Sequence, residues 1–272
     1  MRVLTSLLFA FALLLGGDAK ADEFITVAST TSTQNSGLFK DILPKFTTKT
    51  GINVRVVAVG TGQAIRLAKH GDADVLFVHH RKSEENFVRD GFGVKRYDVM
   101  MNDFVIIGPN SDPAGLTAAK TAADALRAIA KTKAAFVSRG DDSGTHKRER
   151  GLWQEAGIDL KTDGGSWYRE SGSGMGATLN MAQGMGAYAL SDRGTWIAFK
   201  NKKGLSIAHQ GSGNLANPYG VILVSDKKHP HVKTKAGQAF IDWLLSSEGQ
   251  NAIASFKLEG EQLFFPNAKA AN

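Results

Sequence analysis

The feature that most constrains this chain is a repeated alternation of short β-branched runs with longer amphipathic segments. Beginning at Phe24, strand-like runs at 24–30, 52–60 and 73–80 are separated by segments with helical spacing at 36–51 and 61–71. Strand and helix in alternation predict parallel strands joined by right-handed crossovers. The pattern therefore predicts an α/β fold built around a mostly parallel sheet flanked by helices.

The same theme returns further along the chain, after a long extended run at 97–109 that ends at Gly108-Pro109. The elements expected in this second series are helices at 121–132, 143–157 and 175–186 and strands at 134–140, 187–192 and 205–211. A later strand at 220–225 has no place in the second sheet, and the helical segment at 231–256 is expected to return to the first. The chain should therefore cross twice between two lobes.

Length supports two lobes, since about 250 mature residues exceed the usual size of a single domain. We predict that lobe 1 comprises residues 22–104 and 219–272, and that lobe 2 comprises 105–218. The lobes should therefore be joined by two crossover strands.

The first 21 residues have the pattern of a secretory signal peptide. A charged Arg2 precedes an apolar run from Val3 to Leu15, and Ala19-Lys20-Ala21 matches a signal peptidase site. There is no cysteine, and hence no disulfide and no lipid-modified cysteine at the cleavage site. These observations predict an exported protein, in the simplest case periplasmic.

Net charge limits the class of partner. The formal charge is +7, or +6 after removal of Arg2, Lys20 and Asp18 with the signal, and this mildly favours anions. The positive charges are dispersed apart from the cluster at His146–Arg150, and no aromatic-interleaved basic stripe accompanies it. Nucleic acid is therefore not expected as a partner.

Four loops rich in glycine and hydroxyl residues each follow a predicted strand and open a predicted helix: 28–38, 59–65, 138–146 and 170–179. In open α/β sheets, ligands bind beyond the carboxyl ends of the strands. Helix N-termini present free N–H groups and a partial positive charge, and Ser and Thr hydroxyls add hydrogen bonds. Two such loops from each lobe predict an anion site in a cleft between the lobes.

Arg139 is the residue of these loops that supplies a permanent positive charge and a fork of donors for an oxyanion. It precedes Ser143-Gly144-Thr145, where glycine permits close approach of the backbone. The alternative is that Arg139 pairs with Asp141 or Asp142 and that the hydroxyls cap helices.

Other chemistries are less well supported. Ser143, His146 and Asp142 contain the residue types of a hydrolase triad, but three near neighbours on one turn rarely form one, and no G-x-S-x-G elbow is present. His79 and His80 resemble half of a metal site, yet adjacent strand residues point to opposite faces. One of the two histidines is expected to line the cleft. No phosphate-loop or dinucleotide motif occurs.

Aromatic side chains suggest a core rather than a sugar platform at most positions. Trp153 and Trp243 stand at helical spacing from other apolar residues, and we expect them to be buried. Trp167 and Tyr168 lie in a loop and remain candidates for a contact with the cleft or hinge.

On these residues the chain resembles the periplasmic tungstate-binding components of ABC importers (TupA type), within the type II solute-binding proteins. The matching segments are STTSTQNSGL, VVAVGTGQAIRLAKHGDADVLFVHH, VMMNDFVIIGP, SRGDDSGTH and ESGSGMGATLNMA with the following ALSDRGTW. They cover most of the mature chain in the order of the family. The resemblance implies two α/β lobes that close on a tetrahedral oxyanion and dock onto a membrane permease, with no catalytic activity and no cofactor.

Transferred position by position, the resemblance implies oxyanion-binding roles for a defined set of residues: Thr30, Thr31, Ser32, Thr61, Arg139, Ser143, Thr145 and Ser173. It favours tungstate, whereas composition alone leaves phosphate and molybdate open. Phosphate carries a proton near neutrality and needs an acceptor, while tungstate and molybdate need donors alone. We expect a monomer that binds its ligand between lobes hinged near 101–107 and 218–224.

Overall fold

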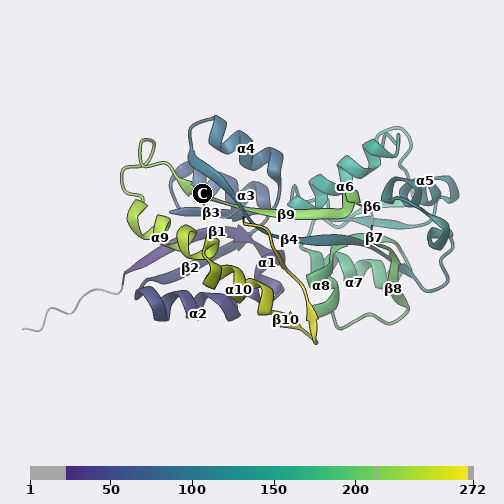
Figure 1. The fold of residues 1–272 in the computed structure, drawn as a ribbon. Helices are drawn as coiled ribbons and strands as arrows, with labels where there is room; N and C mark the ends of the chain where they lie inside the picture. The colour runs from purple at the N-terminus through teal and green to yellow at the C-terminus, as the bar shows by residue number, and fades with distance from the viewer. Residues whose placement is uncertain (1–22, 212, 269–272) are drawn as a thin grey trace, which may run out of the picture.

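The structure of the chain, a computed structural model, describes residues 23–211 and 213–268 (Figure 1). The expected signal peptide at 1–21 lies outside the described residues. Two lobes, each with its own hydrophobic core, are joined by two long strands that run side by side through the middle of the molecule (Figure 1). The prediction of a two-lobed α/β architecture is confirmed.

The first lobe begins as the alternation predicts. Its elements are β1 (Phe24–Thr30), α1 (Thr31–Asn35), α2 (Leu38–Thr50), β2 (Asn53–Val59), α3 (Thr61–His70), β3 (Val75–Val78) and α4 (Arg81–Arg89). Strand β1 lies between β2 and β3 and pairs in parallel with both. The short helix α1 was not predicted, because five residues are too few for a periodic pattern.

The two crossover strands are β4 (Gly93–Pro109) and β9 (Ala216–Val224), which pair antiparallel. Strand β4 pairs with β9 as far as Asp103, and from Phe104 onward it pairs with strands of the second lobe. Strand β9 returns to the first lobe beside β3. The extended run before Gly108-Pro109 therefore carries the chain from one sheet into the other, as expected.

The second lobe contains η1 (Leu116–Ala118), α5 (Ala122–Thr132), β5 (Phe136–Ser138), α6 (Gly144–Glu155), β6 (Tyr168–Glu170), α7 (Met175–Met185), β7 (Ala189–Asp192), α8 (Arg193–Ala198), β8 (Leu205–His209) and η2 (Gly213–Leu215). Strands β7 and β8 pair antiparallel with β4, whereas β5 and β6 pair in parallel.

After β9 the chain packs against the first lobe. The remaining elements are α9 (Thr234–Leu245), α10 (Ser247–Ser255), β10 (Lys257–Leu258), β11 (Glu261–Gln262) and β12 (Phe265–Pro266). Phe240 and Trp243 of α9 meet Phe46 of α2, with ring centroids 5.1 and 5.6 Å from that ring. None of the helices in the described part of the chain has the length and apolar character of a transmembrane span.

Two details differ from the sequence-based expectation. The sheets are mixed rather than mostly parallel, because β9 and β12 run against the β1–β3 direction in the order β12-β4-β9-β3-β1-β2. Trp167 and Tyr168 belong to the second core instead of the cleft: Trp167 is buried beside Trp153, and the Tyr168 hydroxyl donates to Glu149 at 2.8 Å. Trp153 and Trp243 are buried, as predicted.

Candidate functional site

The four glycine- and hydroxyl-rich loops occupy the positions that the sequence predicts. They follow β1, β2, β5 and β6 and open α1, α3, α6 and α7. Because β1 and β2 are parallel neighbours with Thr30 beside Val59, the two loops of lobe 1 start together. Ser138 and Glu170 end the parallel pair β5 and β6 in the same way. Each lobe therefore contributes one pair of adjacent loops.

A hydrogen bond between the lobes brings the two pairs of loops together. The backbone N–H of Gly144, at the start of α6, donates to Thr61 Oγ1 at the start of α3, at 3.0 Å. A side chain at position 144 would meet Thr61 Oγ1 at 2.9 Å and His79 Cε1 at 3.0 Å. Glycine is therefore required for this approach, and the described conformation has the lobes closed on each other.

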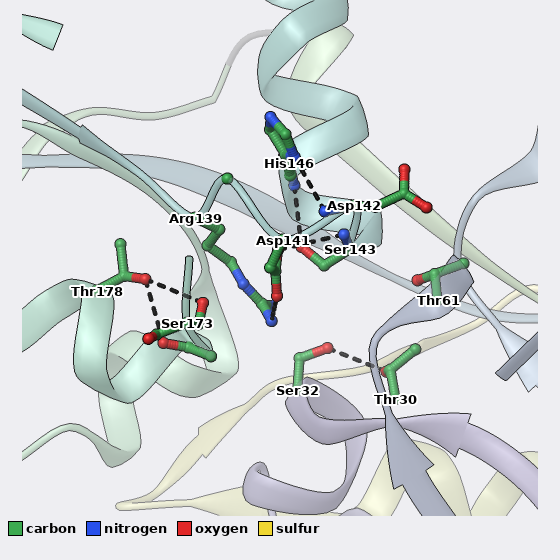
Figure 2. A network of polar contacts seen from close by, with 12 residues as sticks. Thr30, Ser32, Thr61, Arg139, Asp141, Asp142, Ser143, His146, Ser173 and Thr178 are labelled. Carbon is green, nitrogen blue, oxygen red and sulfur yellow. Dashed lines mark hydrogen bonds and ion pairs between the residues drawn. The ribbon is translucent and has the colours of Figure 1, made fainter. Parts of the chain in front are cut away.

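Arg139 is buried, with 3% of its surface exposed. Its side chain extends from the turn after β5 toward lobe 1, with Ser32 on the facing side (Figure 2). The guanidinium donates through Nη2 to Asp141 Oδ2 at 2.5 Å. The pairing with Asp141 that the sequence left open is thus present, but Arg139 Nε is buried without a hydrogen-bond partner among the described residues.

Two of the loop hydroxyls cap helices. Thr30 Oγ1 caps α1 by accepting from Thr33 N, and it also lies 3.1 Å from Ser32 Oγ and 2.7 Å from Thr33 Oγ1. Ser143 Oγ caps α6 by accepting from His146 N at 3.2 Å, which leaves its own proton to donate. Thr145 Oγ1 is buried and has no partner among the described residues.

Helices α3 and α7 begin differently from α1 and α6. Their N-caps are Gly60 and Gly174, and neither has a side chain that caps the first N–H groups. Those N–H groups remain available to another acceptor.

The structure places all eight predicted residues on these four loops. Six of them are buried: Thr30, Ser32, Thr61, Arg139, Ser143 and Thr145. Thr31 and Ser173 are half-buried, and the Ser173 hydroxyl donates within its own loop to Ser171 O at 3.2 Å. The two loops of lobe 2 also contact each other, since Ser171 Oγ donates to Arg139 O at 3.2 Å.

His79 is a member of the site that the sequence did not single out over His80. Its ring is buried, with Nε2 3.1 Å from Ser32 Oγ and Nδ1 2.9 Å from Asn217 Oδ1. The pKa of His79 is lowered from 6.5 to about 4, chiefly by burial; the hydrogen bond to Asn217 opposes this change and the nearby Arg139 charge adds to it. His80 instead caps α4, where its Nδ1 accepts from Ser83 N at 3.4 Å.

Carboxylates near the loops already have donors of their own. Asp192 is buried and accepts from both the N–H and the hydroxyl of Thr195, at 2.8 and 2.7 Å. Burial raises the pKa of Asp192. Besides binding Arg139, Asp141 accepts from Ser143 N at 3.2 Å. Asp142 is exposed and pairs with Lys147 at 3.2 Å.

Contacts around Ser143 do not form a hydrolytic triad. The His146 ring accepts the backbone N–H of Asp142 through Nδ1 at 3.1 Å, while Ser143 Oγ accepts the His146 backbone N–H. Among the described residues, no hydrogen bond joins an imidazole nitrogen to the Ser143 hydroxyl, as activation of that hydroxyl would require. Across the described residues, no group of three or more His, Cys, Asp or Glu side chains is placed to hold a metal ion.

A groove of about 1110 Å³ lies beside this site, between the start of α4, α6 and the start of β9. Cationic side chains from both lobes line it, among them Arg81, Lys82, Lys147 and Arg150. None of the eight predicted residues borders the groove, which is lined next to the site by His79, Asn217 and Asp142. The buried, unpartnered donors therefore mark the candidate site better than the larger open space does.

Comparison with known proteins agrees with this geometry. A family model described as a PBP superfamily domain matches residues 17–248. The chain belongs to the PBP superfamily. It is 48% identical to a putative ABC transporter anion-binding protein of Haloferax volcanii over 94% of this chain and 75% of that protein. It is 47% identical to the tungstate-binding protein TupA of Peptoclostridium acidaminophilum, over 90% of this chain and 86% of that one.

A solved structure gives the same picture in three dimensions. The crystal structure of the tungstate ABC transporter from Geobacter sulfurreducens is 52% identical to this chain and superposes with a TM-score of 0.79. The match covers 87% of this chain and all of that one. As a member of the PBP superfamily with these relatives, the chain shares the fold of solute-binding proteins.

Proposed function

We propose that this protein is the solute-binding component of an ABC importer and that it captures tungstate between its two lobes. The observation that carries the proposal is the pair of buried donors without partners, Arg139 Nε and Thr145 Oγ1, on the loop that faces Thr61 and Ser32. Buried donors of this kind are costly unless something accepts from them. An oxyanion supplies several acceptor oxygens at once, and the names of the TupA relatives support tungstate as that oxyanion.

The charges around the site favour an oxyanion without a proton. Hydrogen phosphate needs one acceptor in its site. Asp141 forms an ion pair with Arg139, and the buried Asp192 interacts electrostatically with it. Each already accepts from two protein donors. These carboxylates are thus engaged by protein donors, whereas the unpartnered donors Arg139 Nε and Thr145 Oγ1 suit a ligand that only accepts, such as tungstate. Molybdate has the same charge and nearly the same shape, so it is the second candidate ligand.

The remaining parts of the proposal concern location and assembly. We infer that residues 1–21 are removed on export, that the mature protein acts in the periplasm as a monomer, and that it delivers its ligand to a membrane permease. The lobes comprise 22–104 with 219–272, and 105–218, and they open and close about β4 and β9. No cofactor and no nucleic acid takes part.

Isothermal titration calorimetry with tungstate, molybdate, sulfate and phosphate tests the proposed function. Tungstate is expected to bind with one site per chain and to be preferred over phosphate and sulfate by a wide margin. Tighter binding of phosphate than of tungstate would reject the assignment. The same titration with Arg148→Gln serves as a control, because Arg148 lies on α6 but bonds to Asn214 O and Glu155 outside the site.

A further inference from the structure

His79 lies where the first lobe, the crossover strand β9 and the start of α6 in the second lobe meet. It follows β3 in lobe 1 and bonds to Ser32 on the loop after β1. Its ring stacks on Tyr219 of β9, with centroids 4.7 Å apart and planes at 26°. Across the interlobe gap, a side chain at Gly144 would collide with it. The position of the ring therefore depends on the seating of lobe 2 as well as on its own lobe.

A chain of side-chain hydrogen bonds runs from the crossover strands through His79 to the site. Asn102 of β4 and Asn217 of β9 are register partners, and Asn217 Nδ2 lies 2.6 Å from Asn102 Oδ1. Asn217 Oδ1 faces His79 Nδ1 at 2.9 Å, and His79 Nε2 faces Ser32 Oγ at 3.1 Å. All four side chains are buried.

The direction in which protons are donated along this series of hydrogen bonds decides whether Ser32 presents its proton or its lone pairs to a ligand. A neutral imidazole has one N–H, and the low pKa of His79 keeps it neutral at physiological pH. If Asn217 Oδ1 accepts from Nδ1–H, then Nε2 accepts the proton of Ser32, and Ser32 turns lone pairs to the site. If both amides turn end for end, the positions of the non-hydrogen atoms are unchanged and every bond in the series reverses. The Ser32 proton is then released from His79 and can be donated to a ligand or to Thr30 Oγ1, 3.1 Å away.

One of the two directions leaves a buried donor group unpaired. With Asn217 Nδ2 donating to Asn102 Oδ1, the Nδ2 group of Asn102 has no partner among the described residues. In the reversed direction, Asn102 Nδ2 donates to Asn217 Oδ1, and the atom left without a partner is the side-chain carbonyl oxygen of Asn102. An unpaired buried N–H group is rarer and more costly than an unpaired carbonyl oxygen. Packing alone therefore favours the reversed direction.

We propose that His79 is a specificity-determining positioning residue: in the ligand-bound protein it carries its proton on Nε2, donates to Ser32, and so directs the Ser32 hydroxyl at a proton-free oxyanion. The donors run in order from Asn102 through Asn217 and His79 to Ser32. The opposite direction would offer lone pairs and suit hydrogen phosphate. This inference rests on the proposed function and names the element that selects against a protonated ligand.

The first test is spectroscopic and uses the unaltered protein. Long-range ¹H–¹⁵N correlation spectra of histidine-labelled protein saturated with tungstate identify which ring nitrogen of His79 carries the proton. The expected result is an Nε2–H tautomer. An Nδ1–H ring, or a doubly protonated one, in the saturated protein overturns the inference while leaving tungstate binding itself intact. Absence of tungstate binding by calorimetry would instead mean that the proposed function fails.

The second test compares two amide replacements of the same residue. In His79→Gln, the longer side chain reaches Ser32 with a donor, and tungstate affinity is expected to stay within about threefold of the wild type. In His79→Asn, the amide reaches Asn217 but not Ser32, and tungstate affinity is expected to fall about tenfold or more with a smaller change for phosphate. Equal tungstate affinities for the wild type and His79→Asn would overturn the inference.

His80→Asn is the matched control. His80 is the neighbouring histidine, it caps α4, and asparagine is also a good N-cap, so tungstate affinity should not change. Melting curves confirm that each variant is folded, and the spectroscopic test decides the question if His79→Asn is not.

Discussion

Replacing Arg139 by glutamine should weaken tungstate binding severely while leaving the protein folded. Arg139 is 3% exposed, and it brings the full positive charge to the loop that faces Thr61 and Ser32. Its Nη2 is held by Asp141, so Nε and the remaining edge of the guanidinium are the groups available to an oxyanion. Glutamine keeps a polar side chain of smaller size but removes the charge.

Two contributions set the size of the affinity loss expected for Arg139→Gln. Removing one partner of a buried, hydrogen-bonded charge pair costs about 2–5 kcal/mol, which corresponds to a loss of about 30-fold to a few thousandfold in affinity. The variant also leaves Asp141 without its cation, so that a carboxylate at this turn repels the dianion. We therefore expect a loss near the upper end of the range. Arg139→Lys retains the charge but not the fork of donors, so its tungstate affinity should lie between those of the wild type and Arg139→Gln.

Calorimetry at one fixed ionic strength measures these affinities, with melting curves to confirm folding. The double variant Arg139→Gln with Asp141→Asn should recover part of the loss, because it removes the repulsion. Arg148→Gln should bind tungstate as the wild type does. A folded Arg139→Gln protein whose affinity lies within about threefold of the wild type would refute the reasoning, because so small a change is below the cost of removing a buried charge partner.

Three further predictions concern closure, an unpaired hydroxyl and a buried carboxylate. In Gly144→Ala, the added methyl group meets the buried Thr61 and His79, so tungstate affinity should fall about tenfold or more. Small-angle scattering should also no longer show compaction when tungstate is added, and normal compaction would contradict this prediction. Thr145→Val removes a hydroxyl with no partner, so the ligand-free protein should gain about 1 kcal/mol of stability while tungstate affinity falls about tenfold; a change of the opposite sign in either quantity would count against the site. Burial raises the pKa of Glu149 from 4.5 to about 7, so the folded state binds this proton more tightly than the unfolded state. Folding stability is therefore lost as pH rises from about 4.5 through about 7, and over this range the melting temperature of the wild type should fall relative to that of Glu149→Gln. Parallel pH profiles of the two proteins would show that Glu149 does not titrate this way.

The periodic elements and the loops were accessible to sequence reasoning because their signals are local. Strand β1 and helix α3 follow directly from residue spacing, and the four loops are recognisable from glycine and hydroxyl residues at strand ends. The eight predicted residues lie on those loops, but the choice of these eight rested on the resemblance to the tungstate-binding family. Their arrangement around one cleft required only the rule that parallel strands end at one edge of a sheet.

What the sequence could not show depends on contacts between distant segments. The bond between His79 and Asn217 joins residues separated by 138 positions, and no local pattern marks either one. The direction of β9 was undetermined, because a short apolar strand reads alike in parallel and antiparallel sheets. Trp167 was a candidate for a contact with the cleft or hinge, yet it packs on Trp153, because loop residues can enter a core that only the fold defines.

The most direct test of the account is the position of tungsten in crystals of the protein grown with tungstate. Anomalous scattering locates the metal without reference to any assumed site. We predict one strong peak between the lobes, within hydrogen-bonding reach of tungstate oxygens from Arg139 and from the starts of α1, α3 and α6. A peak confined to the cationic groove beside α6, or no ordered tungsten between the lobes, would contradict the account.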